Sequence, residues 1–577
     1  MKTRDLPAAA RRVAISRALM LLALAGLAVR ATHLTVVDDR GAQRGRAQTG
    51  QWLTLPPERG TIVDRNGAEF AISVRAPSVY AVSSQIEDIP GTAHKLASIL
   101  GRNASALEAR LQKHTSFQFL SRWISEGKAD RVLALGLPGI GVLHEPRRVY
   151  PHKQLAAQIL GFANIDAIGV RGIEQQEDGW LRGTARRLRA ERDARRDLLI
   201  SANTTEWSTA GGDVALTIDA ALQADAEATL RDAASSTGAI GGFVISMDPN
   251  SGDILALAEL PGFDPNRFRE LDYESTRSRA FLDASEPGST LKIFLIAAAL
   301  ESGTITPDTR FDCENGAFRV PGRTIRDRRP YGSLTVAEIL KVSSNIGAAK
   351  IAQALGRQAH YAMLRRFGFG GSTRSRFPGE SAGVLRPWRE WRPIDHATIA
   401  FGQGVSVTPI QLVAATAVFA NGGEWVRPRL VSARRAAGRS WQPAHRETVR
   451  RVLQPKTAAS MMAMLEAAVG TGGTGRAAAL RGVRVAGKTG TAQKLDPVTH
   501  RYSEDRFRAW FIGIVPADDP KLVILAGLDE PRRPTHTGGA AAAPLFAKVA
   551  AAQLSRLGIF TEPVSAAPVD PHGGENG

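Results

Sequence analysis

Cysteine is almost absent from this chain, because its 577 residues contain only one, Cys313. A single cysteine excludes an intramolecular disulfide and any cysteine-rich metal site. The 11 histidines are scattered, and neither an H-E-x-x-H nor a C-x-x-C motif occurs. Because these motifs are the common zinc and redox signatures, we expect no metal ion and no cofactor.

Acidic residues are also in short supply. Asp and Glu number 56 against 74 Lys and Arg, which gives a formal net charge of +18. Such an excess indicates an anionic partner: nucleic acid, an anionic membrane or an acidic substrate. The hydrophobic share of 43% and the charged share of 23% are typical of globular proteins, so a wholly disordered or collagen-like chain is excluded. The length predicts about four domains.

Long apolar runs are rare, and one is a candidate membrane span. The 12 residues between Arg17 and Arg30 are uncharged. A spanning helix needs about 20 residues, which 18–37 supplies if Arg30 snorkels to the interface. A cleaved signal peptide is the alternative, because Ala23-Leu24-Ala25 is an A-x-A-like site. We favour an uncleaved anchor behind a basic cytoplasmic tail at 1–17. The rest is then exported, so nucleic acid is not an expected partner.

Seven arginines gather in residues 182–196, interrupted by Glu191 and Asp193. A nucleic-acid patch is one interpretation of such a run. No aromatic residue is interleaved, so a stacking surface for single strands is not indicated. We favour the solvated face of an exported domain.

Two exported modules are predicted. In the first, at 38–211, residues 38–57 suggest an extended linker, and 57–73 holds two strand-like runs around an Asp-Arg-Asn-Gly turn, a hairpin signal. The second, at 212–560, has strand-like runs at both ends and helical sequence between them. These runs are 213–219, 241–260, 483–494, 509–517 and 521–529. We expect an α+β domain, with a central antiparallel sheet flanked by helices, and a flexible tail at 561–577.

The segment EPGSTLKIF at 286–294 carries the first chemical motif. Pro287-Gly288 predicts a turn, so Ser289 lies at the N-terminus of a helix, where free N–H groups favour negative charge. Lys292 is three residues on and shares its helix face. A serine hydroxyl needs a base, which a lysine kept neutral by burial can supply. Ser-x-x-Lys alone is common by chance, and a capped helix with a solvent-facing lysine is the alternative.

Two further motifs favour the catalytic interpretation of Ser289 and Lys292 over the capped helix. Ser343-Ser344-Asn345 lies between helical runs; Ser343 can relay a proton, and Asn345 can hydrogen-bond a substrate amide. Lys488-Thr489-Gly490-Thr491 lies on a predicted strand. There Lys488 can support the proton relay, the hydroxyls of Thr489 and Thr491 can hold a carboxylate, and Gly490 permits close substrate approach. The backbone N–H groups of Ser289 and Thr491 are the candidates for an oxyanion hole.

The triple S-x-x-K, S-x-N and K-T-G, with its members 54 and 145 residues apart, is highly specific. It is typical of serine penicillin-recognising acyltransferases. The chain resembles a class B penicillin-binding protein over nearly its whole length, and its division-specific members most. The resemblance is carried by ERGTIVDRNG (58–67), GIEQQEDGWLRG (172–183), DVALTIDAALQ (213–223), FGQGVSVTPIQL (401–412), FIGIVP (511–516) and the late loop 527–546. That loop lacks the aromatic residue often seen before its two glycines.

The resemblance implies a non-catalytic pedestal at 38–211 and a penicillin-binding transpeptidase domain at 212–560. It also implies septal D,D-transpeptidation of peptidoglycan stem peptides through a Ser289 acyl-enzyme, with Lys292 as base and β-lactams as inhibitors. The implied substrates are stem peptides on lipid II-derived glycan strands, and the implied partners are division proteins, including a glycosyltransferase. We expect a single-pass inner-membrane protein with a cytoplasmic N-terminus and a periplasmic catalytic domain, since no extra repeats of the Gram-positive kind follow.

Other functions stay open at this stage. The elongation-specific class B enzyme is the nearest alternative. A D,D-carboxypeptidase or β-lactamase is another, although the chain has no E-x-x-L-N deacylation motif and is far longer than such β-lactamases. A sensor acylated by β-lactams, or a scaffold for division proteins, is the alternative outside catalysis.

Overall fold

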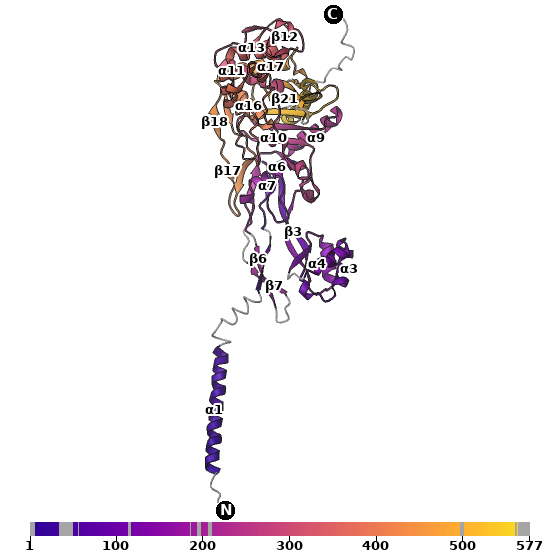
Figure 1. Cartoon of the computed structure of the whole chain (residues 1–577), viewed down its shortest axis with the longest axis vertical. Helices are drawn as coiled ribbons and strands as arrows, with labels where there is room; N and C mark the ends of the chain where they lie inside the picture. Colours follow the sequence, from indigo (N-terminus) through magenta and orange to yellow (C-terminus); the bar gives the residue numbers. More distant parts are fainter. Residues whose placement is uncertain are drawn as a thin grey trace, which may run out of the picture. The chain divides into compact units, whose positions relative to one another are not determined.

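The computed structural model describes residues 6–33, 50–55, 57–113, 117–184, 186–192, 198–205, 210–496, 501–559 and 562–563. The chain forms two compact units (Figure 1). Unit 1 comprises Met1–Pro57, Arg75–Arg147 and Thr184–Thr209, and unit 2 comprises Glu58–Val74, Arg148–Gly183 and Ala210–Gly577. Two segments of the predicted pedestal therefore pack with the predicted catalytic domain, and the pedestal boundaries stay a prediction.

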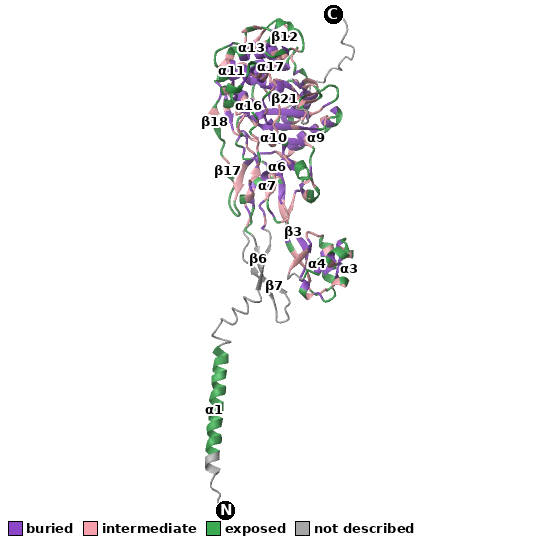
Figure 2. Cartoon of the chain, in the orientation of Figure 1, coloured by how far each residue is buried: buried purple, intermediate pink, exposed green. Residues whose placement is uncertain are grey.

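Helix α1, Leu6–Thr32, begins unit 1. Its part Ala10–Thr32 contains an 18-residue window with a mean hydropathy of 1.8 and is long and apolar enough to cross a membrane, by length and composition. Its described side chains are exposed, as the green colour in Figure 2 shows. The helix begins 12 residues before the predicted anchor at 18–37, because the preceding alanines and arginines are good helix formers and Pro7 suits a first helical turn. Residues 34–37 lie outside the described residues.

The rest of unit 1 combines a small sheet with a helical cluster. Strand β1, Gly50–Leu55, lies within the predicted linker and pairs with β6, Arg186–Arg192, which pairs with β7, Leu198–Thr205; both pairings are antiparallel. The other elements are α3 Ile89–Leu100, α4 Ala104–Leu111, β4 Gln118–Ser121, α5 Glu126–Ala134 and most of β5 Ile140–Val149. Buried Val79, Leu96 and Leu120 form part of their core.

Unit 2 contains residues 58–73 of the predicted hairpin at 57–73. Strands β2, Ile62–Val63, and β3, Glu69–Ala81, pair antiparallel, and β3 continues from Arg75 into unit 1. The Asp64 carboxylate accepts hydrogen bonds from the backbone N–H groups of Asn66 (2.7 Å) and Ala68 (2.8 Å), which closes the turn. Strand β8, Asp213–Leu216, runs parallel to β2 and ties the hairpin to the catalytic part of the unit.

A buried ion network holds these early segments together. Arg59 donates to Glu174 (2.9 Å) and Asp178 (2.5 Å), and Arg148 donates to Glu174 (2.6 Å). Glu174 lies in α7, Gly172–Gln176, and is fully buried. Burial alone would raise the pKa of Glu174, but the charges of Arg148 and Arg59 outweigh it and lower the pKa. Removing one partner would leave an uncompensated buried charge, so the network fixes this packing.

The predicted antiparallel sheet is confirmed in unit 2. Its five strands run in the order β10-β9-β22-β21-β20, and each pairs antiparallel with its neighbour. They are β9 Gly241–Met247, β10 Ile254–Leu260, β20 Ala486–Leu495, β21 Tyr502–Val515 and β22 Leu522–Asp529. Because side chains alternate along a strand, Val244 and Phe511 enter one apolar cluster while Ile245 and Ile512 enter another.

Helices cover both faces of this sheet. Helices α9, Ala220–Thr237, and α18, Ala543–Arg556, pack on one face, and the helices that follow β10 pack on the other (Figure 1). The latter include α11 Lys292–Glu301, α12 Val336–Val342, α13 Asn345–Leu355, α14 Arg357–Arg366, α15 Pro393–Ile399, α16 Pro409–Ala420 and α17 Pro455–Val469. Figure 2 shows buried residues concentrated in these layers. The arrangement confirms the predicted α+β class.

Short elements complete unit 2. They are α6 Ala157–Leu160, α8 Asp178–Leu181, α10 Arg279–Leu282, β11 Arg310–Asp312, β12 Ala317–Val320, β13 Arg323–Arg326, β14 Ser333–Thr335, β15 Glu424–Val426, β16 Val431–Arg435, β17 Gln442–Pro443, β18 Thr448–Arg451, β19 Leu480–Arg481 and β23 Glu562–Pro563. Except for β23, the predicted tail at 561–577 lies outside the described residues.

Candidate active site

Ser289 lies in η5, Gly288–Leu291, a single 3-10 turn that leads directly into α11. Gly288 has a φ of 56°, and a Cβ there would lie 2.7 Å from the Thr491 carbonyl oxygen, so the turn requires glycine. Ser289 is half-buried, and among the described residues its hydroxyl has no hydrogen-bond partner. The hydroxyl is therefore free to meet a substrate at a helix N-terminus, as the sequence predicts.

Lys292 is the first residue of α11 and is fully buried. Its Nζ donates to the Ser343 carbonyl oxygen (2.5 Å), to Asn345 Oδ1 (2.8 Å) and to Ser343 Oγ (3.2 Å). Burial lowers the pKa of Lys292 well below its ordinary value, and the charge of Lys488 lowers it further, while the Asp327 carboxylate acts in the opposite direction. The environment therefore favours a neutral amine beside the serine.

Ser343 stands at the turn between α12 and α13 in the left-handed region, with a φ of 63°. Helices commonly end on a left-handed residue, usually glycine, and a serine there is uncommon. The next helix begins at once, because Ser344 accepts a hydrogen bond from the Gly347 N–H (2.9 Å). This turn aims both oxygens of Ser343 at Lys292 and brings Asn345 to the same amine.

Lys488 approaches the same hydroxyl from the sheet. Its Nζ donates to Ser343 Oγ (2.9 Å), to the Thr489 carbonyl oxygen (3.1 Å) and to Thr489 Oγ1 (3.3 Å). The side chain is fully buried, and burial lowers the pKa of Lys488 to about 7. One serine hydroxyl thus lies between two buried amines, on strand β20 and on helix α11.

Asp327 belongs to this cluster, although the sequence did not mark it. Its carboxylate accepts from Ser344 Oγ (2.5 Å), from the Ile346 N–H (3.1 Å) and from the Asn345 N–H. It therefore holds the turn that carries Ser343. The available signal was weak: Asp327 is the one acidic residue in the arginine-rich stretch 319–329.

Strand β20 is the edge strand beside the segment that carries Ser289. Thr489 Oγ1 donates to Thr474 Oγ1 (3.0 Å), and Thr491 Oγ1 accepts from the Gly538 N–H (3.0 Å). A Cβ at Gly490 would lie 2.9 Å from the Pro287 carbonyl oxygen, so the glycine lets the Ser289 segment pack against the strand. Its predicted part in substrate approach stays a prediction.

A groove lies beside β20 and the segment that precedes Ser289. Its cavity has a volume of about 370 Å³ and is lined by Ala284, Ser285, Glu286, Ser406, Ala492, Gln493, Lys494, Leu495, Tyr502 and Arg508. The Glu286 carboxylate accepts from Tyr502 Oη (2.8 Å) and from the Gly404 N–H (2.8 Å). Burial raises the pKa of Glu286. The groove lies beside an edge strand, and an extended peptide can add to such a strand by main-chain hydrogen bonds.

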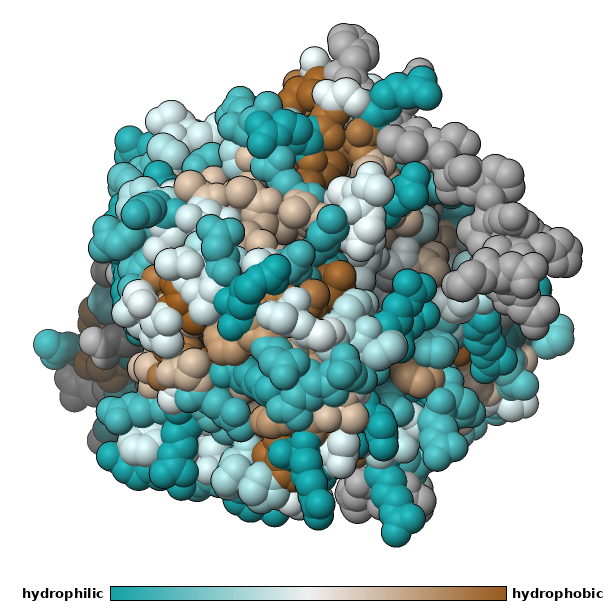
Figure 3. Space-filling view, turned by 90° about the horizontal axis from the view of Figure 1, so that it is seen from above, coloured by the Kyte–Doolittle hydropathy of each residue, from teal (hydrophilic) through white to brown (hydrophobic). Residues whose placement is uncertain are grey.

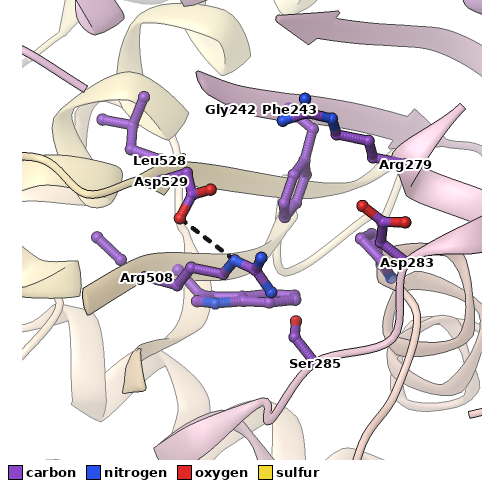
Figure 4. A pocket seen from close by; sticks show the side chains of 11 residues that line it. Gly242, Phe243, Arg279, Asp283, Ser285, Arg508, Leu528 and Asp529 are labelled. Carbon is purple, nitrogen blue, oxygen red and sulfur yellow. Dashed lines mark ion pairs between the residues drawn. The ribbon is translucent and has the colours of Figure 1, made fainter. Parts of the chain in front are cut away.

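A smaller cavity of about 40 Å³ adjoins this groove, since Ser285 and Arg508 line both. Figure 4 shows Arg279, Asp283 and Asp529 around it, with Arg508 paired to Asp529 at 3.4 Å. Because the cavity is small, only a small polar group could contact its charged side chains. Within the described residues, no group of three or more His, Cys, Asp or Glu side chains is placed to hold a metal ion.

These residues define a class of protein. A free serine hydroxyl at a helix N-terminus, a buried amine three residues on, and a second hydroxyl shared with another amine form the apparatus of a serine acyltransferase. The sheet covered by helices on both faces places Ser289, Lys292 and Ser343 on the helical side and Lys488 on the edge strand.

Comparison with known proteins identifies the family. The penicillin binding protein transpeptidase domain matches residues 242–551, and the penicillin-binding protein dimerisation domain matches residues 54–216. The chain belongs to the class B penicillin-binding proteins, which confirms the resemblance noted in the sequence. It is accordingly an enzyme of the serine-type D,D-transpeptidase class that binds peptidoglycan and β-lactams.

Relatives match over nearly the whole chain. The probable peptidoglycan D,D-transpeptidase PenA of Neisseria meningitidis is 34% identical over 96% of this chain and 95% of its own. The peptidoglycan D,D-transpeptidase FtsI of Escherichia coli is 31% identical over 95% of this chain and 92% of its own. The crystal structure of penicillin binding protein 3 from Mycobacterium tuberculosis with aztreonam is 28% identical, with a TM-score of 0.69 over 89% of this chain and 98% of its own.

Proposed function

We propose that the protein is the septal peptidoglycan D,D-transpeptidase of its cell and that it works through an acyl-enzyme on Ser289. The observation that carries the chemistry is the Ser343 hydroxyl, which Lys292 contacts at 3.2 Å and Lys488 at 2.9 Å. For the division role, support comes from the similarity to FtsI and from the late loop, whose Gly538 N–H bonds Thr491.

Acylation begins with proton transfer from Ser289 to Lys292. A neutral amine has two hydrogens and one lone pair. The carbonyl oxygens of Ser343 and Asn345 can only accept, so they take both hydrogens. The lone pair is left for a hydroxyl proton. Ser289 Oγ then bonds to the carbonyl carbon of the penultimate D-Ala.

The oxyanion and the terminal carboxylate are the anionic groups of this step. The backbone N–H groups of Ser289 and Thr491 are proposed to hold the oxyanion. Support comes from the close packing of their segments, since a Cβ on Gly288 would lie 3.5 Å from the Thr491 nitrogen. Thr491 Oγ1 accepts from Gly538, so its own hydrogen is free for the carboxylate, whereas Thr489 Oγ1 donates to Thr474.

Ser343 links the two lysines during expulsion of D-Ala. The tetrahedral intermediate collapses, its carbon–nitrogen bond breaks, and the leaving amine takes a proton through Ser343 Oγ. Lys488 resupplies that hydroxyl, and Asn345 orients the stem amide. The acyl-enzyme then waits for the amine of a neighbouring stem, whose nitrogen bonds to the acyl carbon as the ester bond to Ser289 breaks. Lys292 returns its proton to Ser289, and the attacking amine loses one proton through Ser343 to Lys488, which restores all three groups.

The cellular setting follows from the same proposal. Helix α1 anchors the chain once in the inner membrane, with its basic end in the cytoplasm and unit 2 in the periplasm. The substrates are stem peptides on lipid II-derived glycan strands. The partners are division proteins, including the glycosyltransferase that makes those strands.

Labelling with a fluorescent penicillin tests the chemistry. Ser289→Ala and Lys292→Ala should both abolish labelling, while Ser302→Ala, past the far end of α11, should label like the wild type. Stable labelling of Ser289→Ala would reject the nucleophile, and a normal rate in Lys292→Ala would reject the base. With a synthetic pentapeptide, formation of cross-linked dimer in place of the hydrolysed tetrapeptide distinguishes a transpeptidase from a carboxypeptidase or a sensor.

Depletion in the host cell tests the division role. Septal duty predicts filaments and a tagged protein at midcell. The elongation-specific enzyme is the second candidate, and swollen round cells would favour it. A labelled protein whose depletion changes neither shape nor division would reject both.

A further inference from the structure

A basic surface borders the active site and has no part in the chemistry above. Residues 317–330, here called the arginine hairpin, comprise β12, β13 and the loop that follows. The hairpin carries five exposed arginines against one acidic residue, Asp327: these are Arg319, Arg323, Arg326, Arg328 and Arg329. Figure 3 looks onto the side of unit 2 where β12 lies, and hydrophilic side chains cover much of that face.

These arginines have no acidic partners in the described part of the chain. Elsewhere in unit 2, arginines commonly pair with carboxylates, as in Arg434 with Glu177 (2.7 Å) and Arg484 with Glu466 (2.8 Å). Within the hairpin, Asp327 already accepts from the turn that carries Ser343. The hairpin therefore holds several like charges close together, and a bound anion would relieve their repulsion.

Packing against the core of unit 2 holds the backbone of the hairpin in place. Val320 and Ile325 are buried in the main core of unit 2. The Lys350 amine lies 4.9 Å from the centre of the Phe318 ring. Since side chains alternate along a strand, Arg319 and Arg326 leave β12 and β13 on the face opposite Phe318 and Ile325. Binding an anion would thus require ordering of the arginine side chains alone.

The hairpin lies at the edge of the catalytic cleft. Asn345 Nδ2 donates to the Arg326 carbonyl oxygen (3.1 Å), which ties β13 to the Ser343 turn. On the other side, the positive charge of Arg323 acts on Tyr502, a residue that lines the groove along β20. The hairpin therefore adjoins the Ser343 turn through Arg326 and a residue of the groove through Arg323.

We propose that the arginine hairpin recognises the free carboxylates of the peptidoglycan stem peptide and so selects acidic stems over amidated ones. This inference rests on the proposed function. Arginine suits the task because its planar guanidinium binds a carboxylate through two parallel hydrogen bonds. The carboxylates can belong to the donor stem that acylates Ser289 or to the acceptor stem that attacks it.

The experiment compares two double variants of the full-length protein in phosphatidylcholine vesicles. Arg323→Gln/Arg328→Gln removes two hairpin charges, and Arg376→Gln/Arg439→Gln removes two exposed charges elsewhere in unit 2. In the donor arm, single-turnover acylation is measured with a synthetic stem whose side carboxylates are free and with the same stem amidated. In the acceptor arm, the acceptor stem is varied in the same way. Fluorescent penicillin measures the intrinsic reactivity of Ser289 in all three proteins.

The wild type should prefer the acidic stem in one arm, and added salt should weaken that preference. The ratio of the rates with acidic and amidated stems should fall about 10-fold in the hairpin variant, roughly 3-fold for each arginine at an exposed site. The control variant should keep the wild-type ratio. The arm that responds identifies the stem. Equal preference in wild type and hairpin variant would overturn the proposal, and so would an equal loss in the control. An effect seen only in phosphatidylglycerol vesicles would overturn it in favour of a membrane contact.

The controls distinguish a failure of the hairpin proposal from a failure of the proposed function. If penicillin labels Ser289 but stem preference never changes, the hairpin proposal fails and the proposed function stands. If Ser289 is not labelled in the wild type, the proposed function itself fails.

Discussion

Replacing Lys488 by glutamine tests the electrostatic account of the site most directly. Ser343 Oγ lies 2.9 Å from Lys488 Nζ and 3.2 Å from Lys292 Nζ, so the two nitrogens are at most about 6 Å apart. A positive charge on Lys488 makes protonation of Lys292 harder and lowers its pKa. Lys488→Gln removes that charge and keeps a side chain that can donate to Ser343.

The expected size follows from the separation. Two unit charges about 6 Å apart, at an effective dielectric constant of about 20, repel by about 3 kcal/mol, which corresponds to about 2 pH units. The shift becomes smaller as Lys488 loses its own proton near pH 7 in the wild type. The full shift applies where both amines would be charged, below that pH.

The assay is the rate constant of acylation by a fluorescent penicillin between about pH 5 and about pH 10. Acylation needs neutral Lys292, so the rate rises with pH through the pKa of that amine. Without the charge of Lys488 the proton leaves Lys292 only at higher pH, and the rising limb should move up by as much as about 2 units. The maximal acylation rate should fall as well, but the midpoint pH of the rising limb is measured independently of that maximum.

Arg484→Gln serves as the matched control, because it removes one positive charge from an exposed ion pair with Glu466 in the same unit. Its limb should coincide with that of the wild type. A limb in Lys488→Gln that stays in place or moves to lower pH would refute the coupling of the two amines and, with it, the reason given for a neutral Lys292.

Three further predictions concern the residues around the site. Asp327→Asn should move the same limb to lower pH, because this carboxylate raises the pKa of Lys292, and it should lower stability by about 1–3 kcal/mol; an upward shift would contradict the assignment. Lys488→Met should be more stable than wild type near pH 7, since the folded protein holds this lysine at a pKa of about 7 and the unfolded chain near 10.5. In urea titrations, the gain in the free energy of unfolding at pH 7 should exceed the gain above pH 10.5 by up to about 4 kcal/mol. A gain independent of pH would exclude the lowered pKa of Lys488 as its cause. Gly538→Ala should lower stability by about 1–3 kcal/mol and slow acylation, because its Cβ would lie 2.3 Å from the Gly490 carbonyl oxygen; unchanged values would show that the loop can yield.

The sheet was predictable because its signal is local. Strands β9 and β22, and the half of β21 from Ala509 onward, are mostly apolar runs between turn residues, as expected for strands buried on both faces, whereas the polar first half of β21 gives no such signal. Helix α11 was predictable for a similar reason: an apolar run too short for a membrane must be buried. Helix α1 begins before the predicted anchor, because alanine and arginine both continue a helix, and the bounds of the anchor stay a prediction.

The residues of the candidate active site were predictable from sequence motifs, but the contacts between them were not. Nothing local to Ser343 shows that it adopts a left-handed conformation, since serine has no such preference and the turn is imposed by Asp327 from another segment. The same holds for Thr474 and Gly538, which restrain two threonines of β20 through hydrogen bonds to distant residues. Such pairings are decided by tertiary packing, which a single sequence does not record.

The burial of Lys292 has its cause in the helix that this residue begins. Helix α11 is apolar on all sides, and Phe294 packs against Phe367, Phe369 and Phe419. Burying such a side chain stabilises the fold by about 1.5–3 kcal/mol, and several of them together offset the cost of desolvating one amine. The amine cannot leave the core without moving the helix, so burial holds its pKa well below the ordinary value. The strength of the proposed base is thus set by hydrophobic side chains that pack around the helix and not by polar groups alone.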